Sequence, residues 1–328
     1  MRRFCSLFLC IIACVVFAMG CDRSESEKDD KDLFVIGFSQ VGSESDWRLA
    51  NTKSMQQTFT EGKGYELRME NAKQRQDNQL AAVRNFILEG VDLIIIAPAV
   101  EDGWDTVLTE VKNAGIPVII IDRSVSVSNQ DLFLTNIGSD FLKQGEEAVK
   151  WLESQDIKPA NGRLRILHLQ GTYGATAQLL RTKALENGVE AHRDWEFAAQ
   201  LDGDFTEAKG YEVVKDYLAH DKRIDVLYSE NDNMTFGAMR AFDEAGITYG
   251  ENGQVRIITF DATKKALQYC LDGKIDLCVE CNPMHGPGVE ELIRKYRNGE
   301  EIPKHVYVEE SVFTRENLTP EMIKSRDY

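Results

Sequence analysis

Residues 85–98 read NFILEGVDLIIIAP, and residues 103–124 read GWDTVLTEVKNAGIPVIIIDRS. Each stretch passes from a segment of helical periodicity into a short run rich in Ile that is apolar at consecutive positions, LIIIA at 93–97 and VIII at 118–121. Such runs are typical of parallel strands that helices cover on both faces. Gly115 and Pro117 end the second helical segment just before its strand. The two stretches therefore predict consecutive βα units of an α/β protein.

The same rhythm extends in both directions along the chain. In the first half we expect strands at 33–39, 65–71, 93–97, 118–121 and 132–135, with helices at 47–60, 75–89 and 104–114. After Gly138 the rhythm restarts, with strands at 164–169, 196–201, 226–229 and 256–259 and helices at 140–155, 175–186, 207–219 and 234–245. The last segments, 263–271, 275–280 and 288–297, are too short for a third domain. A chain of 328 residues suits two domains of roughly 150 residues, so we predict two doubly wound parallel-sheet lobes.

Composition and motifs exclude several function classes. The chain has 54 acidic and 38 basic residues and a net charge of −16, which repels nucleic acid and anionic lipid headgroups. It contains no glycine-rich phosphate loop and no GxSxG nucleophile elbow. Its five histidines are scattered, so no zinc site is expected. We therefore expect no cofactor, no metal and no enzyme activity.

The N-terminus has the pattern of an export signal. Arg2 and Arg3 precede an apolar run at 4–19, which is short for a membrane span of roughly 20 residues. The ending Ala-Met-Gly-Cys21 resembles the lipobox of bacterial lipoproteins, which implies that Cys21 is acylated; the alternative is an uncleaved anchor helix. Residues 22–32, DRSESEKDDKD, contain no apolar residue and predict a disordered tether. Either interpretation places the remaining chain outside the cytoplasmic membrane.

Three cysteines lie in the body of the chain, Cys270, Cys278 and Cys281. They are too few and too unevenly spaced for a disulfide framework. We expect buried or surface thiols, and a link from Cys270 to Cys278 or Cys281 is the alternative.

Polar side chains follow several of the predicted strands. In doubly wound sheets, ligands bind outside the carboxyl ends of the strands. Candidates at those ends are Arg48, Asp122, Arg123, Asn231 and Asp261, with Trp47 and Phe205 nearby. Planar polar groups bridge adjacent hydroxyls, and aromatic rings cover the C–H face of a sugar. Each residue alone also fits a salt bridge, a helix cap or the core, but their recurrence at the same strand ends favours a polyol site.

Further segments carry a resemblance to a known family. IGFSQVGSESDWR at 36–48, LQGTYGA at 169–175, GDFTEAKG at 203–210, ENDNM at 230–234 and FDA at 260–262 share their order and spacing with type I periplasmic sugar-binding proteins of the ribose-binding kind, most closely the galactofuranose-binding type. The resemblance spans residue 33 to about residue 310. It implies two lobes, 33–137 with 282–304 and 138–281 with 305–328, joined by three crossovers near Gly138, Cys281 and Pro303.

The resemblance also implies ligand roles. Trp47 and Phe205 match ring contacts, Arg48 a donor, and Asp122 with Arg123 a hydroxyl clamp. Further positions that match ligand contacts are Ser45, Arg181, Asn231 and Asp261. Ribose binders carry an aromatic residue at the position of Arg48, so a larger or more polar sugar than ribose is implied. The chain departs from the ribose type at 280–283, where that type has a glutamine contact.

Together these observations predict a lipid-anchored, extracytoplasmic and monomeric protein that captures a monosaccharide, galactofuranose or a related furanose or hexose. In this family the membrane partner is an ABC permease. The alternative is a sensor that presents its closed form to a membrane receptor kinase. A sugar-responsive repressor would need a DNA-binding segment before Leu33, where an export signal stands instead. A sugar-converting enzyme finds no support in the motifs.

Overall fold

The computed structural model describes residues 33–159 and 162–328. The expected signal segment, Cys21 and the acidic tether lie outside the described residues. Two six-stranded sheets, each covered by helices, make up the described part of the chain, as predicted. Within these two ranges, no helix is both long and apolar enough to cross a membrane.

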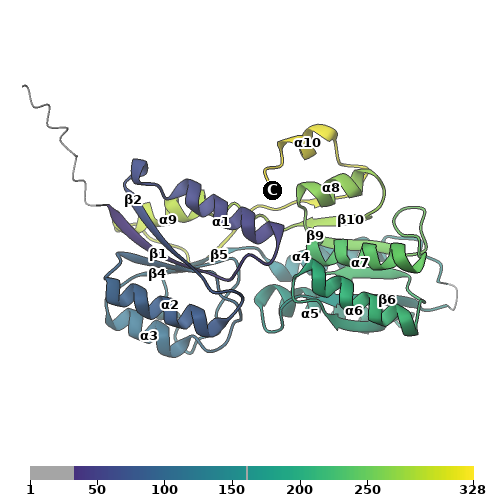
Figure 1. Cartoon of the computed structure of the whole chain (residues 1–328), viewed down its shortest axis with the longest axis horizontal. Helices are drawn as coiled ribbons and strands as arrows, with labels where there is room; N and C mark the ends of the chain where they lie inside the picture. The colour runs from purple at the N-terminus through teal and green to yellow at the C-terminus, as the bar shows by residue number, and fades with distance from the viewer. Residues whose placement is uncertain (1–32, 160–161) are drawn as a thin grey trace, which may run out of the picture. The chain divides into compact units, whose positions relative to one another are not determined.

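The first sheet is entirely parallel, in the order β11-β5-β4-β3-β1-β2. Its strands are β1 (Phe34–Gln40), β2 (Tyr65–Asn71), β3 (Leu93–Ile96), β4 (Val118–Ile121), β5 (Thr135–Gly138) and β11 (His305–Tyr307). The Ile and Val runs of β3 and β4 are fully buried at its centre. Helices α1 (Asp46–Thr58) and α9 (Gly286–Arg297) pack on one face, and α2 (Gln76–Glu89) and α3 (Asp105–Asn113) pack on the other (Figure 1).

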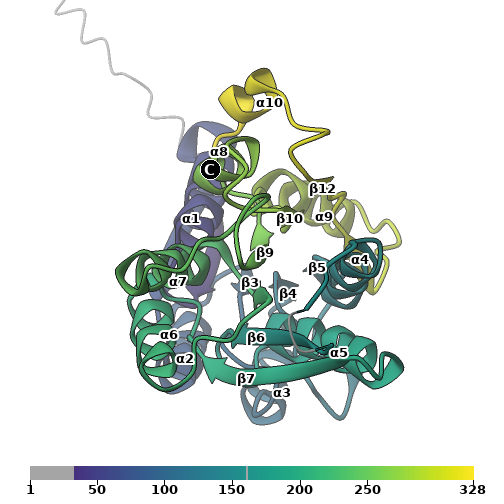
Figure 2. The same ribbon diagram turned by 90° about the vertical axis from the view of Figure 1, so that its right-hand side faces the viewer.

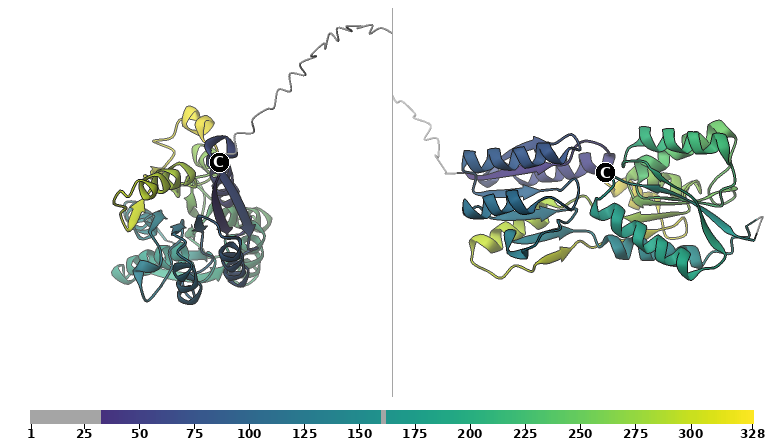
Figure 3. Two further views of the ribbon diagram at one scale, coloured as in Figure 1. Left: turned by 90° about the vertical axis from the view of Figure 1, so that its left-hand side faces the viewer. Right: turned by 90° about the horizontal axis from the view of Figure 1, so that it is seen from below.

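The second sheet has the order β12-β10-β9-β8-β6-β7 and is parallel except for β12. Its strands are β6 (Leu164–Gln170), β7 (Trp195–Asp202), β8 (Val226–Ser229), β9 (Arg256–Asp261), β10 (Leu277–Glu280) and β12 (Val312–Phe313). Helices α4 (Phe141–Glu153) and α5 (Thr176–Ala191) cover one face. The other face carries α6 (Glu207–His220), α7 (Asp232–Ala245), α8 (Lys264–Leu271) and the short α10 (Pro320–Ser325) (Figure 2). Helices lie on both faces of both sheets in the views of Figure 3.

The structure corrects two details of the predicted layout. The strand expected at 132–135 begins at Thr135, because Leu132 and Phe133 turn into the apolar cluster beside α3. The third crossover is not near Pro303, because β11 pairs with β5 in the first sheet. Residues 305–307 therefore belong to the first sheet, and residues 308–311 connect it to β12 in the second.

Candidate functional site

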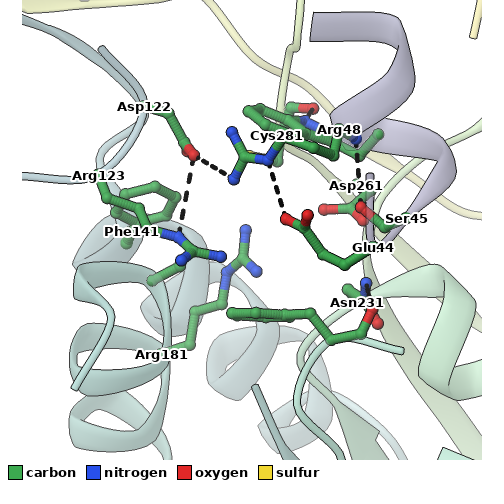
Figure 4. A pocket seen from close by; sticks show the side chains of 13 residues that line it. Glu44, Ser45, Arg48, Asp122, Arg123, Phe141, Arg181, Asn231, Asp261 and Cys281 are labelled. Atoms are coloured by element: carbon green, nitrogen blue, oxygen red, sulfur yellow. Dashed lines mark hydrogen bonds and ion pairs between the residues drawn. The ribbon is translucent and has the colours of Figure 1, made fainter. Parts of the chain in front are cut away.

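A cavity of about 30 Å³ lies between the strand ends of the two sheets. This is room for only about two water molecules, so the two walls lie close together. All nine residues predicted for the site line it: Ser45, Trp47, Arg48, Asp122, Arg123, Arg181, Phe205, Asn231 and Asp261. Four lining residues were not predicted: Glu44, Phe141, Ala177 and Cys281. Figure 4 shows the charged groups of both lobes gathered around this space.

A buried ion-pair cluster forms the first-lobe wall. Ser45 caps α1 by accepting a hydrogen bond from the backbone N–H of Arg48 at 3.2 Å, which fixes the start of the helix. The Arg48 guanidinium donates to Asp122 Oδ2 at 2.7 Å and to Glu44 Oε1 at 2.9 Å. Burial alone would lower the pKa of Arg48, but Asp122 and Glu44 raise it above its ordinary value. Arg48 is therefore a fixed cation in this wall.

Arg123 links the two walls. Its guanidinium donates to the carbonyl of Ala99 at 2.7 Å and lies 5.1 Å from the ring centroid of Phe205 in the second lobe. Burial lowers the pKa of Arg123, and the neighbouring Arg48 lowers it further. A cation over an aromatic face stabilises the closed arrangement of the lobes.

Trp47 contacts the second crossover, which follows β10, on the side away from the cavity. Its indole N–H donates to the Cys281 carbonyl at 2.6 Å, and its ring meets the His285 ring edge-on at a centroid distance of 5.8 Å. The Arg48 guanidinium lies 4.7 Å from the Trp47 ring centroid. The indole plane is therefore fixed without a ligand, so little conformational entropy remains to be lost when a ring stacks on it.

The second-lobe wall combines a guanidinium, an amide and a carboxylate. Arg181 on α5 packs against the rings of Phe141 and Phe260 at 5.2 and 4.6 Å from their centroids. Asn231 caps α7, because its Oδ1 accepts a hydrogen bond from the Met234 N–H at 2.9 Å. The alternative role of a helix cap therefore applies to this residue. Burial raises the pKa of the Asp261 carboxyl well above its ordinary value, and nearby Asp232 raises it further.

Three lining residues occupy the left-handed backbone region, with φ of 64° at Asp122, 57° at Phe205 and 105° at Asp261. Non-glycine residues in such conformations cost about 1–3 kcal/mol each and cluster at ligand sites. The Phe205 ring also depends on Gly171, because a Cβ at that position would lie 1.9 Å from the ring's Cζ atom. The fold therefore accepts local strain at the cavity.

The charges of the lining residues balance. Glu44, Asp122 and Asp261 face Arg48, Arg123 and Arg181, three formal charges of each sign. Glu44 Oε2 is buried and has no hydrogen-bond partner among the described residues. A buried acceptor without a partner is costly, so a ligand hydroxyl at Glu44 would stabilise the closed cavity. A neutral molecule with many hydroxyl groups matches the lining of this cavity.

The two lobes meet in hydrogen bonds at the rim of the cavity. The backbone N–H of Asp46 at the start of α1 donates to Asn233 Oδ1 at 3.0 Å, and Asn233 Nδ2 donates back to Asp46 Oδ2 at 3.3 Å. On another side, the Ser124 N–H donates to Thr176 Oγ1 at 2.8 Å. The structure is therefore in a closed arrangement.

Two of the lining residues that the prediction missed, Glu44 and Cys281, carry no local signal of a ligand contact. Glu44 directly precedes Ser45 in the loop after β1, but it is one of 54 acidic residues and nothing local marks it as buried. Cys281 lies where the chain departs from the ribose-binding pattern. Cys270, Cys278 and Cys281 are free, buried thiols. In the described part of the chain, no group of three or more His, Cys, Asp or Glu side chains is placed to hold a metal ion.

Two parallel-sheet lobes that face each other across a small polar cavity define a bilobal solute-binding protein. The family model of the periplasmic binding protein domain matches residues 36–284. The chain belongs to the periplasmic binding protein family, in its type I sugar-binding group, whose members bind ligands and are not enzymes.

Three relatives span nearly the whole chain. The galactofuranose-binding protein YtfQ of Escherichia coli (strain K12) is 33% identical over 89% of this chain and 91% of its own length. A Mycobacterium smegmatis protein in complex with β-D-fucofuranose is 38% identical, with a TM-score of 0.82 over 89% of this chain and 93% of that chain. The binding-protein component of the arabinose ABC transporter from Shewanella sp. ANA-3, bound to α- and β-L-arabinofuranose, is 36% identical, with a TM-score of 0.82 over 89% and 95% of the two chains.

Proposed function

We propose that this protein captures a furanose monosaccharide in the cavity between its lobes and delivers it to an ABC permease. The observation that carries the proposal is the lining of this cavity, where three carboxylates and three guanidiniums from both lobes converge. Such a lining offers paired donors and acceptors to hydroxyl groups. The names of the three relatives support a five-membered ring form, since they specify galactofuranose, fucofuranose and arabinofuranose.

The proposal assigns a role to each wall. Asp122 and Arg123 of the first lobe bind adjacent hydroxyls of the sugar. Ser45, Arg48 and the unpaired Oε2 of Glu44 bind further hydroxyls near the N-terminus of α1. In the second lobe, the contacts are proposed for Arg181, Asn231 and Asp261. Trp47 and Phe205 enclose the ring faces. Closure is then favoured because one ligand satisfies polar groups of both lobes at once.

The partner and the anchor belong to the same proposal. The Shewanella relative is a component of an ABC transporter, which favours a permease over a receptor kinase as partner. Acylation of Cys21 would hold the monomeric protein at the outer side of the membrane, close to that permease. Replacing Cys21 by Ser should move the protein from the membrane fraction to the soluble extracytoplasmic fraction. An unchanged distribution would argue against the lipid anchor and leave the sugar site unaffected.

The direct test uses sugars locked in one ring form. We expect methyl β-D-galactofuranoside and methyl α-L-arabinofuranoside to raise the melting temperature, and the matching methyl pyranosides to have little effect. A ligand at 100 times its Kd adds about 2.7 kcal/mol to the free energy of unfolding. For a domain of this size, that raises the melting temperature by about 5–10 °C. Calorimetry then gives the affinity. If none of the four glycosides shifts the transition, the furanose proposal is wrong.

A further inference from the structure

Glu310 lies in the third crossover, residues 308–311, and its carboxylate touches the other two. Its Oε1 accepts hydrogen bonds from the Ser139 hydroxyl, just after β5, and from the backbone N–H of Asn282 at 2.8 Å, just after β10. One carboxylate oxygen thus joins all three connections between the sheets. These connections are the segments that must twist when the lobes open.

The other oxygen of Glu310 is connected to the cavity through α4. Gln144 Nε2 donates to Glu310 Oε2 at 2.7 Å and to the Glu280 carbonyl at 3.0 Å. Gln144 Oε1 accepts from Arg181 Nε at 3.0 Å and from Arg181 Nη2 at 2.8 Å. Both neighbours of the amide nitrogen are acceptors and both contacts of the amide oxygen are donors, so only one orientation of the Gln144 amide satisfies the network.

The Arg181 guanidinium depends on this connection for its orientation. Three of the five N–H groups of a guanidinium are used by protein acceptors here, two by Gln144 Oε1 and one by the Glu230 carbonyl. The remaining N–H groups belong to a side chain that lines the cavity, and Figure 4 shows this guanidinium directed into it. If the Gln144 amide turned over, two donors would face the guanidinium and it would have to move.

We infer that Glu310 and Gln144 are positioning residues that couple the hinge to the ligand-binding guanidinium of Arg181. The inference rests on the proposed sugar function and assigns to it two residues that do not line the cavity. The Glu310 carboxylate holds the crossovers in their closed arrangement and, through Gln144, presents Arg181 to the ligand. Burial raises the pKa of Glu310, and the hydrogen bonds from Ser139, Asn282 and Gln144 oppose this shift by stabilising the ionised carboxylate.

The test compares two neighbouring glutamates. In E310Q, the side-chain oxygen can still accept from Ser139 and Asn282, but the new amide nitrogen faces the donating nitrogen of Gln144. E309Q makes the same charge change in the same crossover at an exposed side chain. We expect calorimetry with methyl β-D-galactofuranoside to show about 10-fold weaker binding for E310Q, as for the loss of one charged hydrogen bond. The affinity of E309Q should stay within twofold of wild type.

A double-mutant cycle separates positioning from a general structural role. If Glu310 acts through Arg181, the effect of E310Q on affinity should largely disappear in an R181K background. An equal effect in both backgrounds, or wild-type affinity in E310Q, overturns the inference. If E310Q does not fold, as judged by its melting curve, Q144L breaks the same connection without altering a crossover and is judged by the same thresholds.

Failure of the sugar proposal remains distinguishable. If wild-type protein binds no glycoside, the proposed function fails, and X-ray scattering without sugar decides the hinge role. E310Q should then have a larger radius of gyration than wild type and E309Q. Identical scattering profiles for the three proteins would overturn the inference.

Discussion

Replacing Asp122 by Asn changes the charge of the cavity with little change in shape. Asp122 Oδ2 accepts from Arg48 at 2.7 Å, and the two side chains are 5% and 2% exposed. An Asn side chain keeps an oxygen for Arg48 and tolerates the left-handed backbone at this position, where φ is 64°. Ala would lose both advantages, and breaking a buried ion pair outright costs about 3–5 kcal/mol of stability. The Asp122→Asn variant therefore tests the charge rather than the fold.

The expected loss of affinity follows from the proposed clamp. A hydrogen bond to a charged group contributes about 1.5–3 kcal/mol, so the Kd for methyl β-D-galactofuranoside should rise roughly 10- to 150-fold. The matched control is Asp102→Asn, an exposed aspartate of the same lobe, which should bind like wild type. Calorimetry gives the affinities, and melting curves without sugar show whether the variants are folded. A folded Asp122→Asn protein whose Kd lies within twofold of wild type would refute the role given to this carboxylate.

Two further predictions concern closure and pH. Asn233→Ala removes both rim hydrogen bonds to Asp46. We therefore expect stopped-flow measurements to show about 5- to 10-fold faster sugar release, with unchanged preference among glycosides. An unchanged release rate would show that this contact does not hold the lobes closed. Burial lowers the pKa of His285 to about 4 from an ordinary 6.5. Between these two pH values the unfolded chain therefore binds more protons at this side chain than the folded protein does. The free energy of unfolding consequently falls as the pH drops from about 6.5 to 4. His285→Gln should lessen this loss by up to about 3 kcal/mol, and parallel pH-stability curves for the two proteins in denaturant titrations would contradict the prediction.

Elements with strong local patterns were predictable from the sequence. The runs LIIIA and VIII predicted β3 and β4, and both strands form the buried centre of the first sheet. The polar residues after the strands were predictable as a set, because parallel strands place their carboxyl ends at one edge of a sheet. Strand β11 gave no such signal. Only Val306 is half-buried in this strand, and its neighbours His305 and Tyr307 are exposed. The strand therefore has no apolar face that a sequence pattern could reveal.

Residues whose role depends on a distant partner were not predictable. Glu44 is buried because it accepts from Arg48, and Glu310 is half-buried because it meets Ser139, Gln144 and Asn282. In a chain with 54 acidic residues, neither carboxylate differs locally from the exposed ones. Burial of a charge is a property of tertiary contacts, so only the folded structure separates these two from the rest.

The balance of charge within each wall bears on what closes the cavity. The first lobe contributes Arg48 and Arg123 against Glu44 and Asp122, and the second contributes Arg181 against Asp261. The first wall is formally neutral whether or not Asp261, whose pKa is raised by burial, is protonated, so attraction between opposite net charges does not draw the lobes together. The contributions to closure are the rim hydrogen bonds of Asp46 with Asn233 and of Ser124 with Thr176, the stacking of Arg123 on Phe205, and unfilled hydrogen-bonding groups such as Glu44 Oε2. A ligand that supplies hydroxyls to both walls adds a differential free energy to the closed state alone, and that is the requirement for capture by closure.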